Sequence, residues 1–166
     1  MTRLAFFSEA AGDPHARLAR LAATLAADMR LAGALQESVG PADDCDVDLR
    51  VLGDPRPPLR ISQSLGRGST ACRLDAGALE EAAARVAARL DGAELLILSK
   101  FGKQEAAGRG FRQVIGLALE SDLPVILHVP PEYRADFDAF AGPLAQELTP
   151  EALEPWCRAA ARAPAA

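Results

Sequence analysis

Two nearly continuous apolar segments constrain the fold of this chain more than any other feature of its sequence. They are Leu95-Leu96-Ile97-Leu98 and the run 124–129, Pro-Val-Ile-Leu-His-Val. A strand with one wet face alternates apolar and polar residues, whereas a strand of a parallel sheet is covered on both faces and is apolar almost throughout. A third short run, 4–7, has the same character. We therefore predict an α/β fold with a mostly parallel sheet.

Segments with helical spacing separate these strands. Apolar residues recur at every third or fourth position after Asp13-Pro14, after Asp75 and after Phe111. Asp13 and Asp75 are expected to be N-caps, and Gly33 is expected to end the first helix as its C-cap. Alternating strands and helices form right-handed crossovers that place helices on both faces of the sheet. The predicted architecture therefore has three layers.

The segment 46–63 has a different pattern. Apolar and polar residues alternate in it, and turn formers fill positions 53–58. This pattern predicts a β-hairpin with one wet face, inserted at the edge of the main sheet. A short strand is also expected at 34–36. Because no long linker divides the chain, we predict a single domain, 1–163, followed by a frayed tail, 164–166.

Composition and charge exclude several classes of protein. The formal net charge is −5, so neither nucleic acid nor an anionic membrane is an expected partner. No apolar run approaches the roughly 18 residues that a membrane span needs, and the first residues lack the apolar stretch of a signal peptide. Three widely spaced cysteines, Cys45, Cys72 and Cys157, suit a reducing compartment. We therefore expect a cytoplasmic protein whose mature fold begins at Met1.

The segment 60–73 combines basic, hydroxyl and glycine residues. Glycine lets backbone N–H groups turn toward a ligand, hydroxyl groups donate hydrogen bonds, and Arg presents paired donors. Such donors match a tetrahedral oxyanion or a phosphate. The alternative is a polar loop whose Arg side chains pair with surface carboxylates. The candidate oxyanion-binding residues of this segment are Arg60, Ser62, Gln63, Ser64, Ser69 and Arg73.

A second donor-rich segment, 99–112, directly follows the most apolar strand. It contains the only two lysines of the chain, Lys100 and Lys103. Lys is a compact point charge that suits phosphate-like anions, and open α/β sheets bind ligands beyond the carboxyl ends of their strands. We add Lys100, Lys103 and Arg109 to the candidate oxyanion-binding residues, and we regard Lys100 and Glu105 as candidate catalytic residues. The alternative is a flexible, glycine-rich entry to the next helix.

The loop after the first strand does not match a nucleotide-binding signature. A Walker A motif needs Gly-x-x-x-x-Gly-Lys-Ser/Thr. This loop has only Gly12, together with Glu9 and Asp13, which would repel phosphate. The sequence therefore argues against ordinary ATP hydrolysis. His15 and His128 lack a recognisable ligand or triad spacing, and we interpret His128 as a core or rim residue.

The two donor-rich segments contain long motifs. They read Ser62-Gln63-x-Leu65-Gly66-x-Gly68-Ser69-x-x-Cys72-Arg73-Leu74-Asp75 and Lys100-Phe101-Gly102-Lys103-Gln104-Glu105-Ala106-x-Gly108-Arg109-Gly110. These motifs resemble the two signatures of the bacterial domain-of-unknown-function family 2478. The similarity runs nearly end to end, from residue 4 to about residue 156.

The resemblance implies a fold related to P-loop nucleoside triphosphatases. In that comparison, 95–105 is similar to the strand and loop that carry the acidic Walker B group of nucleotide phosphatases. Ser99 and Lys100 stand here in place of the acidic residues. Together with the missing Walker A motif, this departure argues against triphosphatase activity. The resemblance also implies an association with molybdate uptake genes, which makes molybdate or tungstate a natural oxyanion.

Three functions follow as alternatives. The first is a cytoplasmic binding protein for a molybdate-like or phosphate-like oxyanion at the C-terminal edge of the sheet. The second is a divergent nucleotide-binding phosphohydrolase. In it, Lys100 or Lys103 replaces the P-loop lysine, and Glu105 positions water or the Mg²⁺ ion that accompanies a bound nucleotide. The third is a non-catalytic subunit or adaptor whose hairpin 46–63 pairs with a partner or a second copy. We predict no metal site of the protein's own, because the acidic turn 43–48 is typical of a solvated turn.

Overall fold

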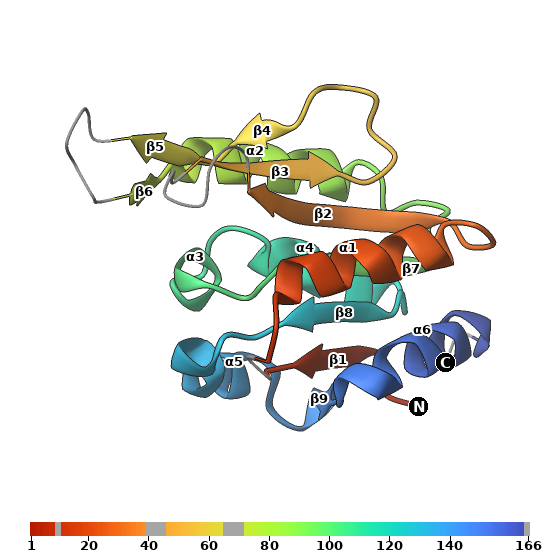
Figure 1. Cartoon of the computed structure of the whole chain (residues 1–166). Helices are drawn as coiled ribbons and strands as arrows, with labels where there is room; N and C mark the ends of the chain where they lie inside the picture. Colours follow the sequence, from red (N-terminus) through yellow and green to blue (C-terminus); the bar gives the residue numbers. More distant parts are fainter. Residues whose placement is uncertain (9–10, 39–45, 65–71, 165–166) are drawn as a thin grey trace.

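The computed structural model describes residues 1–8, 11–38, 46–64 and 72–164. The strands of its main sheet are β1 (Leu4–Phe7), β2 (Leu31–Ser38), β3 (Val47–Val51), β4 (Leu59–Arg60), β7 (Leu95–Leu98), β8 (Val125–His128) and β9 (Ala145–Glu147). They lie in the order β4-β3-β2-β7-β8-β1-β9 (Figure 1). Neighbours from β2 to β9 are parallel, and β3 is antiparallel to β2 and to β4. The predicted mostly parallel sheet is confirmed.

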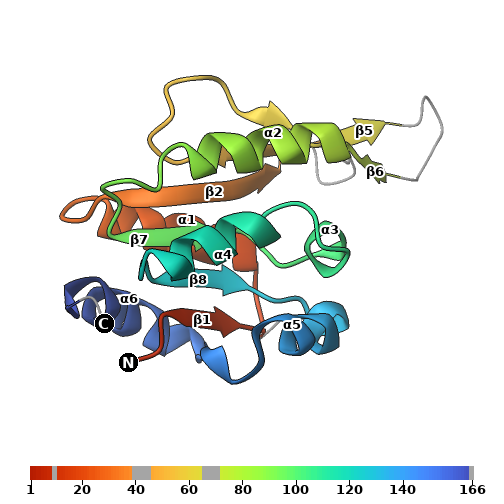
Figure 2. The ribbon, with the colours of Figure 1, turned by 180° about the vertical axis from the view of Figure 1, so that it is seen from behind.

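Helices cover both faces of this sheet (Figures 1 and 2). The α-helices are α1 (Pro14–Leu25), α2 (Ala76–Ala87), α3 (Lys103–Ala106), α4 (Arg112–Glu120), α5 (Arg134–Ala141) and α6 (Leu153–Arg162). Short 3₁₀ turns are η1 (Pro131–Tyr133), η2 (Gly142–Leu144) and η3 (Pro150–Ala152). Helices α1 and α6 pack on one face, whereas α2, α4 and α5 pack on the other. The result is the predicted three-layer fold.

The alternation of side chains along the central strands explains the two cores. In β8, Val125 and Leu127 belong to the apolar cluster beneath α2, α4 and α5, and Ile126 belongs to the cluster beneath α1 and α6. All three side chains are fully buried. A strand covered on both faces must be apolar at every position, which is the pattern that predicted it. Within the described part of the chain, no helix has the length and apolarity to span a membrane.

The edge of the sheet beyond β2 is antiparallel. Strands β3 and β4 pair within the segment predicted as a hairpin, 46–63. The prediction for Gly33 was wrong, because α1 ends at Leu25 and Gly33 lies inside β2. Gly33 has a φ of 141°, and a Cβ atom there would collide with the carbonyl of Ile97 in β7. Close approach of two strands, rather than a helix end, explains this glycine.

A second, two-stranded ribbon projects beyond the carboxyl ends of the main strands. It pairs β5 (Ser62–Ser64) with β6 (Cys72–Leu74) in antiparallel fashion. The sequence predicted the first of these segments as the end of the hairpin and the start of a loop. The Val47 N–H of β3 donates to the Ser62 Oγ (2.8 Å), which joins the ribbon to the sheet, and the Asp75 N–H donates to the Ile61 carbonyl (2.7 Å), which closes the base of the ribbon. Figure 1 shows the ribbon and α3 at the same end of the molecule.

Candidate functional site

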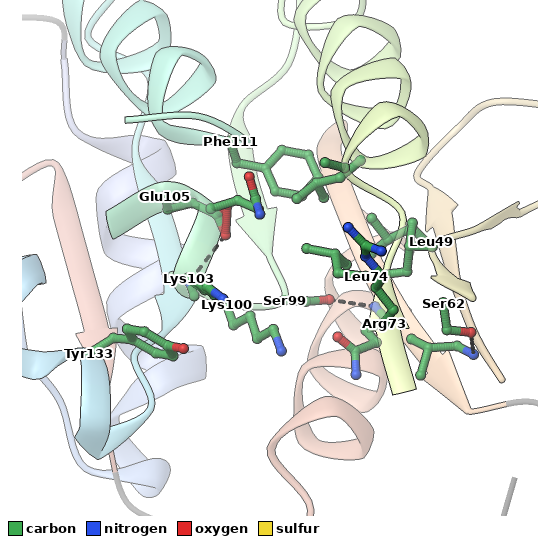
Figure 3. Close-up of a pocket in the computed structure, with 17 residues that line it drawn as sticks. Leu49, Ser62, Arg73, Leu74, Ser99, Lys100, Lys103, Glu105, Phe111 and Tyr133 are labelled. Carbon is green, nitrogen blue, oxygen red and sulfur yellow. Dashed lines mark hydrogen bonds between the residues drawn. The ribbon is translucent and has the colours of Figure 1, made fainter. Parts of the chain in front are cut away.

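A cavity of about 620 Å³ lies between the β5–β6 ribbon and the loop that follows β7. Figure 3 shows its two walls, with Ser62, Arg73 and Leu74 on one side and Lys100, Glu105 and Tyr133 on the other. Its base includes apolar side chains such as Leu79 and Phe111. The cavity therefore joins the two donor-rich segments, although they are far apart along the chain.

Three cationic side chains line this cavity, and each comes from a different element. Arg73 lies in β6, Lys100 follows β7, and Lys103 begins α3. Among the described residues, none of the three forms an ion pair with a carboxylate. In Figure 3 the side chains of Lys100 and Arg73 extend into the space between the walls. The cavity therefore carries positive charge that the described part of the protein does not neutralise by direct pairing.

Hydroxyl groups at the base of the cavity differ in what they offer a ligand. The buried Ser99 hydroxyl accepts a hydrogen bond from the Gln36 N–H and donates one to the Ala34 carbonyl (3.2 Å), so it joins β7 to β2. The Ser62 Oγ accepts from the Val47 N–H and keeps its own proton. A hydroxyl group carries one donor and two acceptor positions. Ser62 can therefore still donate to an anion in the cavity.

Glu105 lies in the wall of the cavity and is almost fully buried, with 3% of its surface exposed. Its Oε1 accepts a hydrogen bond from the Gly102 N–H (3.1 Å). Burial raises the pKa of this carboxyl, while the Gly102 hydrogen bond opposes the shift. Oε2 packs against Gly110, and a Cβ atom at that position would collide with it. Glu105 thus holds the loop 102–110 in place, and its catalytic role stays a prediction.

The surroundings of Glu105 also bear on whether the cavity could hold the Mg²⁺ that would accompany a bound nucleotide. Mg²⁺ needs an octahedral set of oxygen ligands, commonly including one or two carboxylates. Glu105 is the only carboxylate among the described residues that line the cavity, and Arg73, Lys100 and Lys103 stand beside it. Within the described chain there is no group of three or more potential metal ligands. The donor set around this cavity suits an anion and does not fit a protein-held Mg²⁺.

The structure does not bring every candidate residue to the cavity. Arg60 is not among the described lining residues, and its guanidinium pairs with Asp46 (3.1 Å) and Asp48 (2.5 Å) on the edge strands. Arg109 also lies outside the lining, where its Nε donates to the Gln104 Oε1 (2.9 Å). For Arg60, the structure thus matches the alternative of pairing with surface carboxylates.

Several other candidates cannot be placed. Gln63 and Ser64 belong to β5, but their side chains lie outside the described residues. Ser69 and residues 43–45 of the acidic turn lie outside them as well. The candidates that the structure assembles at the cavity are Ser62, Arg73, Lys100, Lys103 and Glu105.

Sequence reasoning missed two residues that line the cavity. Gln36 lies in the last part of β2, beside the carboxyl end of β7. Tyr133 follows the carboxyl end of β8. Their positions after central strands were the available signal, because such residues meet at one edge of a parallel sheet. The pairing of β5 with β6 had no comparable signal in the sequence.

The backbone N–H groups at the start of α1 bind a carboxylate of the protein itself. Asp13 is the N-cap of α1, and its side chain accepts from the backbone N–H groups of His15 (2.9 Å) and Ala16 (3.3 Å). Pro14 supplies no N–H group at the first helical position. The free amides of a helix N-terminus attract anions, and here two of them already bind Asp13. This geometry agrees with the missing Walker A motif.

Two solved structures share this fold over nearly the whole chain. One is the crystal structure of THEP1 from the hyperthermophile Aquifex aeolicus, with a TM-score of 0.62, 16% identity and 96% of each chain covered. The other is the solution structure of a human cancer-related nucleoside triphosphatase, with a TM-score of 0.59, 15% identity and coverage of 96% and 95%. The chain therefore has the same three-layer α/β fold as these two proteins.

The family can be stated more narrowly. Residues 4–156 match the family described as "Protein of unknown function (DUF2478)", and the chain belongs to that family. A further relative, the molybdenum import ATP-binding protein ModC 2 of Bradyrhizobium diazoefficiens strain USDA 110, is 32% identical over 133 residues. That match covers 78% of this chain but only 15% of the relative's length.

Proposed function

We propose that this protein binds a doubly charged oxyanion in the cavity between the β5–β6 ribbon and the loop after β7. One observation carries the proposal. Arg73, Lys100 and Lys103 come from separate elements, line one cavity, and form no ion pair among the described residues. A cluster of like charges destabilises a fold unless a counter-charge compensates it. A bound dianion would supply that charge.

The energetics suit a binding protein. A hydrogen bond to a charged group contributes about 1.5–3 kcal/mol, and micromolar affinity corresponds to about 8 kcal/mol. Three cationic side chains and the Ser62 hydroxyl therefore suffice for an affinity in that range. Arg73 offers paired donors to two oxygens, whereas the two lysines act as point charges.

The relatives narrow the choice of anion. The similarity to a protein named for molybdenum import and ATP binding favours molybdate, tungstate or a nucleotide phosphate as the ligand. A cytoplasmic location belongs to the same proposal, because these anions would be met there. Because the match spans 15% of that relative, transport itself is not carried over to this chain.

Isothermal titration with molybdate, tungstate, sulfate and phosphate at constant ionic strength tests the proposal. We expect micromolar binding of at least one of the four. Arg73→Gln and Lys103→Gln should each weaken it about tenfold, which is the loss of one interaction of about 1.4 kcal/mol. Arg60→Gln is the matched control, because Arg60 is already paired and outside the cavity, and its affinity should stay within about twofold of the wild type. Absence of heat for all four anions would end the proposal.

Nucleotide hydrolysis is the second candidate, and the fold is the observation that favours it. The carboxylate of Asp13 at the start of α1 and the cationic surroundings of Glu105 count against it. Phosphate release from ATP or GTP with Mg²⁺, abolished in Lys100→Ala, would favour hydrolysis over simple binding. Release that continues in this variant would remove Lys100 from the reaction.

An adaptor role is the third candidate. Strand β4 lies at one edge of the sheet, and an edge strand can pair with another chain. Light scattering on the purified protein distinguishes a second copy from a monomer.

A further inference from the structure

Three polar side chains without hydrogen-bond partners gather at the carboxyl ends of β1 and β8. Ser8 follows β1, His128 ends β8, and His15 is the second residue of α1. The Ser8 Oγ, the His15 Nδ1 and both ring nitrogens of His128 are buried and have no partner among the described residues. His128 is only 6% exposed. Unpaired buried polar groups are rare in native proteins, and each calls for an explanation.

The topology places these three residues at one edge of the sheet, and His15 is close enough to His128 to act on its charge. His128 pairs in register with Phe7 across the β1–β8 ladder, and the two rings lie 5.0 Å apart. The chain leaves β1 toward α1 on one face of the sheet and leaves β8 toward α5 on the other face (Figures 1 and 2). Adjacent strands with connections to opposite faces form a crevice, and open α/β sheets bind ligands there. Ser8, His15 and His128 stand at this crevice.

The charged groups near His15 and His128 determine which class of ligand the crevice can bind. Burial, together with His15 and Lys100, lowers the pKa of His128 to about 4, while Glu132 of η1 opposes the shift. Burial also lowers the pKa of His15, Lys100 adds to this effect, and Asp13 opposes it. Both imidazoles are therefore neutral at pH 7, and each has one N–H donor. Lys100 is the nearby cation that acts on both rings.

We propose that Ser8, His15 and His128 form an oxyanion subsite next to the cavity, and that an anion bound there is accompanied by proton uptake at the imidazoles. The hydroxyl group, the imidazole N–H groups and the Lys100 ammonium are all donors. The subsite shares Lys100 with the proposed cavity site but does not need Arg73 or Lys103. An anion beside Lys100 cancels the charge that now disfavours protonation of both rings. By linkage, anion affinity then rises as the pH falls.

A metal ion fits this cluster less well than an anion. Zinc sites use three or four protein ligands, and only two imidazoles and a serine are described here. The Lys100 ammonium, which already disfavours positive charge on both rings, would repel a metal ion in the same way. A single ordered water could also join these groups, and it would leave the histidines insensitive to added anions.

The chain has two histidines, so an imidazole spectrum of the whole protein reports on this subsite alone. Imidazole nitrogen–proton correlation spectra of the whole protein are recorded across pH 4 to 8 with tungstate or inorganic phosphate, and with chloride at equal ionic strength as the control. We expect the pKa of both rings to rise by about one unit in the presence of the binding anion. Affinity should then increase severalfold between pH 8 and pH 6, mainly through His15, because His128, with a pKa of about 4, stays neutral over that range. His15→Gln assigns the signals and should remove most of that pH dependence.

The variants separate this subsite from the cavity. In Arg73→Gln/Lys103→Gln, the imidazole response should persist at higher anion concentration. Anion binding that leaves both imidazoles unmoved overturns the subsite while the cavity proposal stands. Imidazole signals that respond to Zn²⁺ and not to anions also overturn it. Ser8→Ala leaves the aromatic packing of His128 intact, so unchanged affinity and pH dependence in that folded variant would count against the subsite as well.

Discussion

At the scale of single residues, the candidate site depends on a buried carboxyl and the glycine beside it. Glu105 holds the Gly102 amide, and its second oxygen packs against Gly110. Gly110 has a φ of 60° and donates its N–H to the Glu80 carboxylate (2.7 Å). The glycine thus meets two demands, a left-handed backbone and a position without a Cβ atom. Lys103 and Arg73 can share a cavity because this loop is fixed.

Gly110→Ala tests that fit. A side chain at a left-handed position costs about 1–2 kcal/mol, and overpacking against Glu105 costs about 1–3 kcal/mol more. We therefore expect the free energy of unfolding to fall by about 2–5 kcal/mol in urea titrations, together with weaker anion binding.

Gly116→Ala is the matched control for this experiment. Gly116 lies within α4, where a Cβ atom would meet nothing within 4 Å. Alanine is a better helix former than glycine, so this variant should gain about 0.5–1 kcal/mol. Equal stability of the two variants would contradict our account of Gly110.

At the scale of elements, the start of α1 depends on its N-cap. The Asp13 side chain binds two amides of the first turn and fixes the direction in which the chain leaves β1. Asp13→Ala should lower the free energy of unfolding by about 1 kcal/mol, because those amides lose their acceptor. Thermal melts would measure this loss. Asp13→Asn keeps an oxygen acceptor and should recover most of it, and a larger loss in Asn than in Ala would refute the capping role.

The sequence predicted elements whose signal is local. The central strands, the N-caps at Asp13 and Asp75 and the antiparallel pairing in 46–63 follow from periodicity and capping chemistry. Gly33 was misassigned because its role depends on a neighbouring strand, 64 positions away at Ile97, and not on its own helix.

The candidate site was predictable for similar reasons and only in part. Lys100 and Lys103 follow an apolar strand, which marks a ligand-binding edge of the sheet. The β5–β6 ribbon depends on pairing across 65–71, and such pairing has no periodic signal in three-residue strands. The unpaired histidines also escaped prediction, because their proximity arises from the β1–β8 register.

At the scale of the whole molecule, the two ends of the chain are joined. The Arg3 guanidinium, next to β1, binds the Asp122 carboxylate (2.7 Å) and the carbonyls of Ala160 (2.7 Å) and Pro164 (2.9 Å). Helix α6 buries Trp156 and Cys157 against the sheet. The last helix is therefore part of the core, and we expect it to unfold together with the sheet.

The thiol of Cys157 reports on that cooperativity. Burial raises its pKa to about 12, so the native thiol is protonated and inaccessible. In a Cys45→Ser/Cys72→Ser background, a thiol reagent should label Cys157 at the rate of global unfolding. Added urea should increase the labelling rate and the unfolding rate by the same factor. Labelling at the rate of a free thiol in the native protein would show that α6 opens independently.

The carboxylate that caps α1 has a consequence for anion binding at that end of the helix. Two amides of the first turn already bind Asp13, and Pro14 has no N–H group to offer. An anion that reached these amides would have to displace a side chain of the protein itself, so anion binding here should depend on side-chain donors and not on the start of a helix.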